Sequence, residues 1–291
     1  MTASQPNGGK LDDVIEEDLT VPARDGYPIP VRTYKPKSPS SSGSPLVVFI
    51  HGGGFALGGL EGEELNCRLF TQKLGCTCVN VDYRLAPEHP FPTPVLDSWD
   101  VVKWAANNYT KLGADPSEGF IVGGTSAGGN ISAVVGHLAR DEKLQPPLTG
   151  LSLLIPAVLD HTLTHVDEEY KKQIISYEQN KDAPILPLKS VEIFMENYKP
   201  DPTSHLFNLF APPINFSNLP PTVFQICGMD PLRDEAILYE RLLREKYNCK
   251  TKSYMYPGVP HGFWSFFPQG EISKNFVQDT VKGIEWLLQQ K

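Results

Sequence analysis

The chain lacks long apolar runs and has no leader-like start. No apolar stretch approaches the ~20 residues that a membrane-spanning helix needs. The opening stretch, MTASQPNGGKLDDVIEEDLT, has neither a basic beginning nor an apolar core, so we expect no signal peptide. The expected location is therefore the cytoplasm, with no membrane association.

Positive charge is also scarce. The 291 residues carry 26 Lys and Arg against 34 Asp and Glu, which gives a formal net charge of −8. An excess of negative charge repels phosphate backbones and anionic lipid surfaces. We therefore expect no nucleic acid as a partner, and the expected ligand is a small molecule.

Cysteines are few, and their arrangement suits neither disulfides nor a metal. The chain has five, an odd number, without the spacing that is typical of metal sites. We expect five reduced thiols, as is usual for cysteines in the cytosol. We also expect no bound metal. They are Cys67, Cys76, Cys78, Cys227 and Cys249.

Strand-like and helix-like segments alternate along most of the chain. Strands are expected at 28–36, 46–51, 77–83, 119–124, 150–156, 222–228 and 250–256. Helices are expected at 62–75, 93–109, from 126 onward, 188–198, 232–247 and 270–289. This alternation predicts one α/β domain over residues 1–291, with a mainly parallel sheet covered by helices on both faces.

The alternation breaks between residues 160 and 215, which are polar and dotted with proline. In parallel sheets the chemistry gathers at the carboxyl ends of the strands. We expect residues 160–215 to form a small cap over that edge. Residues 1–20 are a short N-terminal segment that is available to extend the cap.

The stretch GFIVGGTSAGGN at 119–130 contains a glycine-rich turn that does not fit a phosphate loop. A P-loop needs Lys after its second glycine, and none is present here. The dinucleotide fingerprint G-x-G-x-x-G fails as well, because no three of these glycines have that spacing. We therefore expect no nucleotide cofactor, and no other cofactor is indicated.

The same turn does fit G-x-S-x-G, with Ser126 between Gly124 and Gly128. In a nucleophile elbow, a sharp strand-to-helix turn forces the serine to positive φ and leaves no space for side chains at the flanking positions. The motif alone is weak, since a serine that caps an ordinary strand-to-helix turn gives the same letters. Its context has to decide.

Three further strand ends supply that context. HGGGF at 51–55 follows the strand 46–51, and its glycines leave N–H groups free to face a developing oxyanion. Asp230 follows the strand 222–228, and His261 follows the strand 250–256. The order Ser, Asp, His, each after a strand, favours nucleophilic acyl transfer. Asp234, one helical turn after Asp230, is the alternative acid, but Asp230 lies directly at the strand end.

These motifs resemble the hormone-sensitive-lipase family of esterases, which have the α/β-hydrolase fold. The resemblance rests on HGGGF (51–55), DYRLAPEHPFP (82–92), GTSAGG (124–129), DPLRDE (230–235) and HGF (261–263), and it extends over residues 20–290. It implies Ser126 as nucleophile, Asp230 as acid and His261 as base. It also implies an oxyanion hole made by the N–H groups of Gly53, Gly54 and Ala127, and its members are often dimers.

Thr125 and Arg84 lie close to these motifs in the sequence. Many relatives carry Asp before the nucleophile, whereas this chain has Thr125, which removes a carboxylate there. Arg84 and Glu88 are expected to form an ion pair behind the oxyanion loop.

Seven apolar residues, six of them aromatic, are the candidates for an apolar pocket wall, with the hydrophobic core as the alternative place for each aromatic ring. They are Phe55, Leu57, Phe194, Phe207, Phe210, Phe263 and Trp264. Such a wall suits short- to medium-chain acyl or aryl esters, which indicates a carboxylesterase. The same triad would also serve a lactonase, an arylformamidase-type amidase or a hydrolase for one metabolite ester. A non-catalytic small-molecule receptor is a further alternative.

Overall fold

Fully buried strands form the middle of the molecule. In the computed structural model, which describes residues 12–40 and 43–290, every residue of the strands LVVFI and TCVNV is buried. Burial on both faces is typical of parallel strands that helices cover. The strands are β1 (Val14–Pro22), β2 (Pro28–Pro36), β3 (Leu46–Ile50), β4 (Thr77–Val81), β5 (Phe120–Thr125), β6 (Gly150–Leu154), β7 (Thr222–Met229) and β8 (Thr251–Pro260).

These strands form one sheet in the order β1-β2-β4-β3-β5-β6-β7-β8. β2 is antiparallel to both of its neighbours, and all the pairs from β4 to β8 are parallel. After β3 the chain forms β4 on one side of β3, and it then crosses back to form β5 on the other side of β3. The loops after β3 and β5 therefore diverge at the same edge, which is where ligands bind in open α/β sheets.

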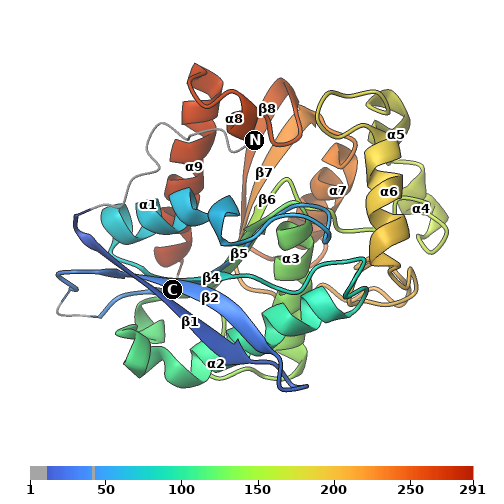
Figure 1. Ribbon diagram of the computed structural model, residues 1–291. Helices are drawn as coiled ribbons and strands as arrows, with labels where there is room; N and C mark the ends of the chain where they lie inside the picture. Colours follow the sequence, from blue (N-terminus) through green and yellow to red (C-terminus); the bar gives the residue numbers. More distant parts are fainter. Residues whose placement is uncertain (1–11, 41–42, 291) are drawn as a thin grey trace.

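Helices cover both faces of the sheet (Figure 1). α1 and α9 pack together on one face, while α2, α3 and α7 pack on the other. The longer helices are α1 (Glu64–Leu74), α2 (Thr93–Leu112), α3 (Ala127–Asp141), α6 (Leu188–Tyr198), α7 (Arg233–Glu245) and α9 (Glu271–Leu288). Short turns of helix are η1 (Leu60–Gly62), η2 (Pro116–Glu118), α4 (Glu168–Lys171), α5 (Ser176–Gln179) and α8 (Phe263–Phe266). Within the described residues, no helix is both long and apolar enough to cross a membrane.

Every strand and helix expected from the sequence is present, with ends that differ by a few residues. The segment between β6 and β7 carries α4, α5 and α6, which lie side by side at one end of the molecule (Figure 1). The expected start of the third helix at Ser126 is also close, since α3 begins at Ala127.

The N-terminal residues differ from the expectation. Residues 14–20 form most of β1, which pairs along its whole length with β2 at the edge of the sheet, so they do not extend the cap. The connecting turn contains Asp25-Gly26, and Gly26 adopts φ 85°, a conformation that favours glycine. This hairpin turn was the available sequence signal for β1. Residues 1–11 of the expected segment lie outside the described residues.

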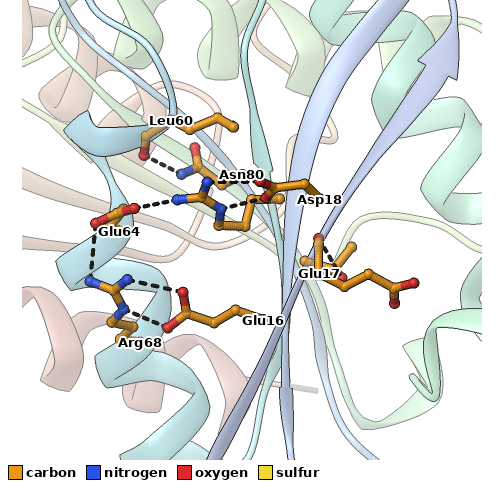
Figure 2. Close-up of polar contacts among 9 residues, drawn as sticks. Glu16, Glu17, Asp18, Leu60, Glu64, Arg68 and Asn80 are labelled. Atoms are coloured by element: carbon orange, nitrogen blue, oxygen red, sulfur yellow. Dashed lines mark hydrogen bonds and ion pairs between the residues drawn. The ribbon is translucent and has the colours of Figure 1, made fainter. Parts of the chain in front are cut away.

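A charged network fastens this edge hairpin to α1 (Figure 2). Arg68 on α1 meets both carboxylate oxygens of Glu16 on β1, at 2.7 and 2.9 Å, and Glu64 at 3.0 Å. Arg32 on β2 binds Asp18 and Glu64. The edge of the sheet and the first turn of α1 are therefore held in one position.

Candidate active site

Ser126 occupies a sharp turn between β5 and α3. Its backbone has φ 57° and ψ −112°, so the predicted positive φ is confirmed. Its neighbours have no space for side chains: a Cβ on Gly128 would lie 2.0 Å from the carbonyl oxygen of Ile50, and one on Gly124 would lie 2.4 Å from the same atom. Close packing of β3 against this turn therefore requires glycine at both positions. The turn places Ser126 at the wall of a cavity.

A histidine and a carboxylate extend from this hydroxyl in one line. Nε2 of His261 lies 2.9 Å from Oγ of Ser126, and Nδ1 of His261 lies 2.7 Å from Oδ2 of Asp230. The other carboxylate oxygen of Asp230 accepts a hydrogen bond from the N–H of Leu232 at 2.9 Å. Asp230 is 1% exposed and His261 is 8% exposed, so water has little access to their hydrogen bond.

Asp234 makes different contacts. Its carboxylate accepts hydrogen bonds from the backbone N–H groups of Ile175 at 2.9 Å and Ser176 at 2.8 Å. It therefore holds the segment around α5 and does not meet His261. Of the two acids that the sequence left in competition, Asp230 is the one beside the histidine.

The glycine-rich loop after β3 lies beside Ser126 and lines the same cavity. Gly53 has φ 116° and Gly54 has φ 60°. A Cβ on Gly53 would lie 2.1 Å from the carbonyl oxygen of Leu57, so the loop closes only with glycine there. The N–H groups of Gly53, Gly54 and Ala127 donate no hydrogen bond to another described residue. All three residues line one cavity together with Ser126, where their N–H groups could meet an oxyanion.

That cavity has a volume of about 450 Å³ and a mostly apolar wall. One side comes from the loops after β3, β5 and β8, including Ser126 and His261. The other side comes from the segment between β6 and β7, through Ile185, Leu186, Val191, Phe194 and Met195. The Phe194 ring packs against Gly54, where a Cβ would lie 2.3 Å from the ring. An ester bond placed at Ser126 would thus have apolar surface around it.

Comparison with known proteins places this site in a family. A family model described as the alpha/beta hydrolase fold matches residues 47–265. The chain belongs to the α/β-hydrolase family. AB hydrolase superfamily protein B1A11.02 of Schizosaccharomyces pombe is 44% identical over 280 residues, which span 95% of this chain and 81% of that protein.

Two further matches agree with this assignment. Versiconal hemiacetal acetate esterase of Dothistroma septosporum is 37% identical, over 94% of this chain and 82% of that protein. The crystal structure of vibralactone cyclase superposes with a TM-score of 0.91 at 38% identity, over 97% of this chain and 82% of that one. The resemblance to the hormone-sensitive-lipase group of α/β-hydrolases and the predicted fold class are both confirmed.

The pocket wall of this α/β-hydrolase differs in part from the prediction. Phe55, Leu57, Phe194 and Trp264 do line the cavity. Three other predicted wall residues do not, because the hydrophobic core takes up their rings. Phe207 packs on Phe55 and Tyr198, Phe210 on Tyr170, Phe216 and Tyr239, and Phe263 on Tyr256, Trp264 and Phe276.

The contacts behind the glycine-rich loop also differ. Arg84 pairs with Asp97 at 2.7 Å and with Asp25 at 2.8 Å, so its expected pairing with Glu88 is wrong. Asp97 is 1% exposed, and its burial explains why it takes the guanidinium. His51, at the start of the loop, stacks on Tyr83 with 4.2 Å between ring centres. Burial lowers the pKa of His51 to about 4, so its ring is neutral at physiological pH.

Sequence reasoning missed one polar group in the cavity wall. Glu63 and Asn66, at the start of α1, line the cavity together with Thr125. Burial raises the pKa of Glu63 to about 7. The only sequence signal was their position shortly after HGGGF, in a segment that the pattern marks simply as helix.

Proposed function

We propose that this hydrolase cleaves short- to medium-chain acyl or aryl carboxylic esters through an acyl-enzyme on Ser126. The protein is a hydrolase that acts on ester bonds, as its family and its esterase relatives show. The observation that carries the mechanism is the unbroken line from Ser126 Oγ through the His261 ring to Asp230, with steps of 2.9 and 2.7 Å. We place the activity in the cytoplasm, where the five free thiols of the chain would stay reduced.

The first half of the reaction forms the acyl-enzyme. His261 Nε2 takes the proton from Ser126 as Oγ attacks the ester carbonyl. Asp230 holds the imidazole in the tautomer that leaves Nε2 free to accept, and it stabilises the imidazolium that forms. The oxyanion of the tetrahedral intermediate faces the N–H groups of Gly53, Gly54 and Ala127.

The second half releases the acid. His261 returns its proton to the leaving alcohol oxygen as the C–O bond breaks, which leaves the acyl group on Ser126. A water molecule then attacks this acyl ester while His261 accepts one of its protons. Ser126 leaves with the proton from His261, and the carboxylic acid departs.

The decisive experiment compares wild type with Ser126→Ala on p-nitrophenyl esters from acetate to laurate. We expect turnover by wild type to peak at short or medium chains, because the cavity holds about 450 Å³. Removing the nucleophile should lower kcat by ~10⁶-fold. Equal turnover by both proteins would contradict the mechanism. Tight ligand binding without any turnover by wild type would indicate a receptor instead.

A lactone is the second candidate substrate. Support comes from the close superposition on the crystal structure of vibralactone cyclase. The same serine and oxyanion hole would open a cyclic ester by the same steps. Measuring γ- and δ-lactones beside the linear esters, with acid release followed by titration, separates the two: a higher kcat/KM on the lactones would favour this second function.

A further inference from the structure

One corner of the cavity is polar, in contrast to the rest of its wall. Apart from His261, Glu63 is the only ionisable acidic or basic side chain among the described residues that line it. Glu63 precedes the first turn of α1 and is 2% exposed. Asn66, one turn later, lines the same corner, and Thr125 stands next to Ser126. The corner therefore adjoins the reacting serine.

The Glu63 carboxylate lacks a countercharge. It accepts a hydrogen bond from Nδ2 of Asn66 at 2.6 Å. Within the described part of the chain, no Lys, Arg or His nitrogen lies within 4.0 Å of it. Burial raises its pKa to about 7, while hydrogen bonds from the Thr125 hydroxyl and from Asn66 act in the opposite direction.

A carboxyl group in such a place destabilises the fold, because burying an unpaired charge is costly. Its neighbours show that it is held there firmly. Nδ2 of Asn80 donates to the carbonyl oxygen of Leu60 at 2.6 Å, and Glu64 is held by Arg32 and Arg68 (Figure 2). These contacts fix the segment on both sides of Glu63. A costly, rigidly placed polar group that faces a ligand cavity is typical of a binding site.

We propose that Glu63 and Asn66 form a polar subsite that binds a hydroxyl group of the ester substrate. This proposal rests on the function proposed above. The Asn66 amide donates to Glu63, so the corner offers a Glu63 oxygen and the Asn66 carbonyl oxygen as acceptors. A substrate hydroxyl can donate to either of them, and it can also accept from Glu63 when that carboxyl is protonated. The expected substrate is thus an ester with an apolar body and one hydroxyl.

The competing view is that Glu63 only stabilises the start of α1 or the turn at Thr125. In that case its removal would change the turnover of all esters by the same factor. A subsite would instead change the ratio between a hydroxylated ester and its parent. This ratio is therefore the measurement that separates the two.

The test uses two pairs of esters, followed by acid release. Propyl butyrate and 3-hydroxypropyl butyrate differ by a hydroxyl on the alcohol side, while ethyl butyrate and ethyl 3-hydroxybutyrate differ on the acyl side. For at least one pair, we expect wild type to favour the hydroxylated ester in kcat/KM. Glu63→Leu should lower that preference by about 10- to 100-fold, since a hydrogen bond to an ionisable group is lost. Glu63→Gln keeps an acceptor and should lower it less.

Glu61→Gln is the matched control, because Glu61 is an exposed carboxylate in the same segment that does not line the cavity. It should leave the ratio as in wild type. Equal ratios in wild type, Glu63→Leu, Glu63→Gln and Asn66→Ala for both pairs would overturn the subsite while leaving the esterase function intact. A third alcohol, in 3-aminopropyl butyrate, tests the charge. A higher kcat/KM on this ester than on 3-hydroxypropyl butyrate would overturn the hydroxyl assignment in favour of an ammonium group. Failure of wild type to hydrolyse any of these esters would overturn both proposals.

Discussion

Ser126 adopts a backbone conformation that a residue with a Cβ rarely takes. Its φ of 57° persists because β3 and α3 approach each other across Gly124 and Gly128. This local strain aims the hydroxyl at His261. The spacing of small residues around this serine indicated the turn, because the constraint is local and steric, but the motifs at the other strand ends were needed to distinguish it from an ordinary serine cap.

Gly128→Ala tests the steric requirement directly. The new Cβ would lie 2.0 Å from the Ile50 carbonyl oxygen, a backbone atom that cannot move alone. We expect the turn to shift and kcat/KM on p-nitrophenyl butyrate to fall by ~100-fold or more, since displacements of about 1 Å have that effect. Overpacking should also lower the free energy of unfolding by about 1–3 kcal/mol.

Gly59→Ala is the control for this substitution. Its nearest neighbour would be a carboxylate oxygen of Glu61 at 3.2 Å, the end of a flexible side chain. Its activity and stability should stay close to those of wild type. An active Gly128→Ala enzyme would show that the elbow tolerates a side chain and that the tight packing is incidental.

Other residues of the site lay beyond sequence reasoning. Glu63 meets Thr125 only because α1 begins beside the end of β5, and no local pattern encodes that contact. Phe207 and Phe210 illustrate the opposite error: both were assigned to the pocket wall, but long-range packing buries their rings in the core. Ser126, Asp230 and His261 were predictable because each of them follows a strand of the parallel sheet, whereas contacts that depend on how a helix or loop packs were not.

At the scale of elements, α5 is hydrogen-bonded to the loop that carries Asp230. The Asp234 carboxylate accepts hydrogen bonds from the N–H groups of Ile175 and Ser176. In addition, Oγ of Ser176 donates to the carbonyl oxygen of Pro231 at 2.6 Å. Nδ2 of Asn180 donates to the carbonyl oxygen of Asp230 at 2.9 Å. This part of the segment between β6 and β7 therefore supports the loop that carries Asp230.

Asp230→Asn and Asp234→Ala should consequently have different effects. Asp230→Asn places an amide beside His261 and favours the wrong tautomer, so kcat should fall by ~10⁴-fold. Asp234→Ala removes the acceptor for two N–H groups of α5. We expect it to lower the free energy of unfolding by about 1–2 kcal/mol and to change kcat by less than about 10-fold. Steady-state kinetics and urea unfolding of both variants measure this contrast, and the reverse pattern would make Asp234 the catalytic acid.

The alternation of strands and helices made most elements predictable, since buried strands and amphipathic helices carry their periodicity in the sequence. β1 was missed because its burial alternates irregularly and its place depends on pairing with β2. The short helices α4 and α5 were missed for a related reason. Tertiary hydrogen bonds such as those to Asp234 hold them, and single turns of helix have little stability of their own.

At the scale of the whole molecule, burial of ionisable groups sets the pH dependence of stability. Burial lowers the pKa of His51 to about 4 and that of His137 to about 3, from the ordinary value of 6.5. The unfolded chain then binds more protons than the folded one below pH 6.5, so these two groups make stability fall as the pH drops. Burial raises the pKa of Glu63 to about 7 and that of Glu235 to about 8, from 4.5. The stabilising contribution of these two glutamates to the free energy of unfolding is fully present below pH 4.5, and it is lost as the pH rises through 7 for Glu63 and through 8 for Glu235.

The two effects oppose each other between pH 4.5 and 6.5, and above pH 6.5 the glutamates act without the histidines. We therefore expect the free energy of unfolding to decrease from pH 6.5 to pH 8 by about 2 kcal/mol, since each unit of pKa shift is worth ~1.4 kcal/mol. Urea unfolding at several pH values in this range measures the decrease. In the double variant Glu63→Gln/Glu235→Gln the curve should become nearly flat, because an amide keeps an acceptor but does not titrate, while Glu61→Gln should retain the wild-type slope. A double variant with an unchanged slope would mean that both buried glutamates are already ionised below pH 6.5.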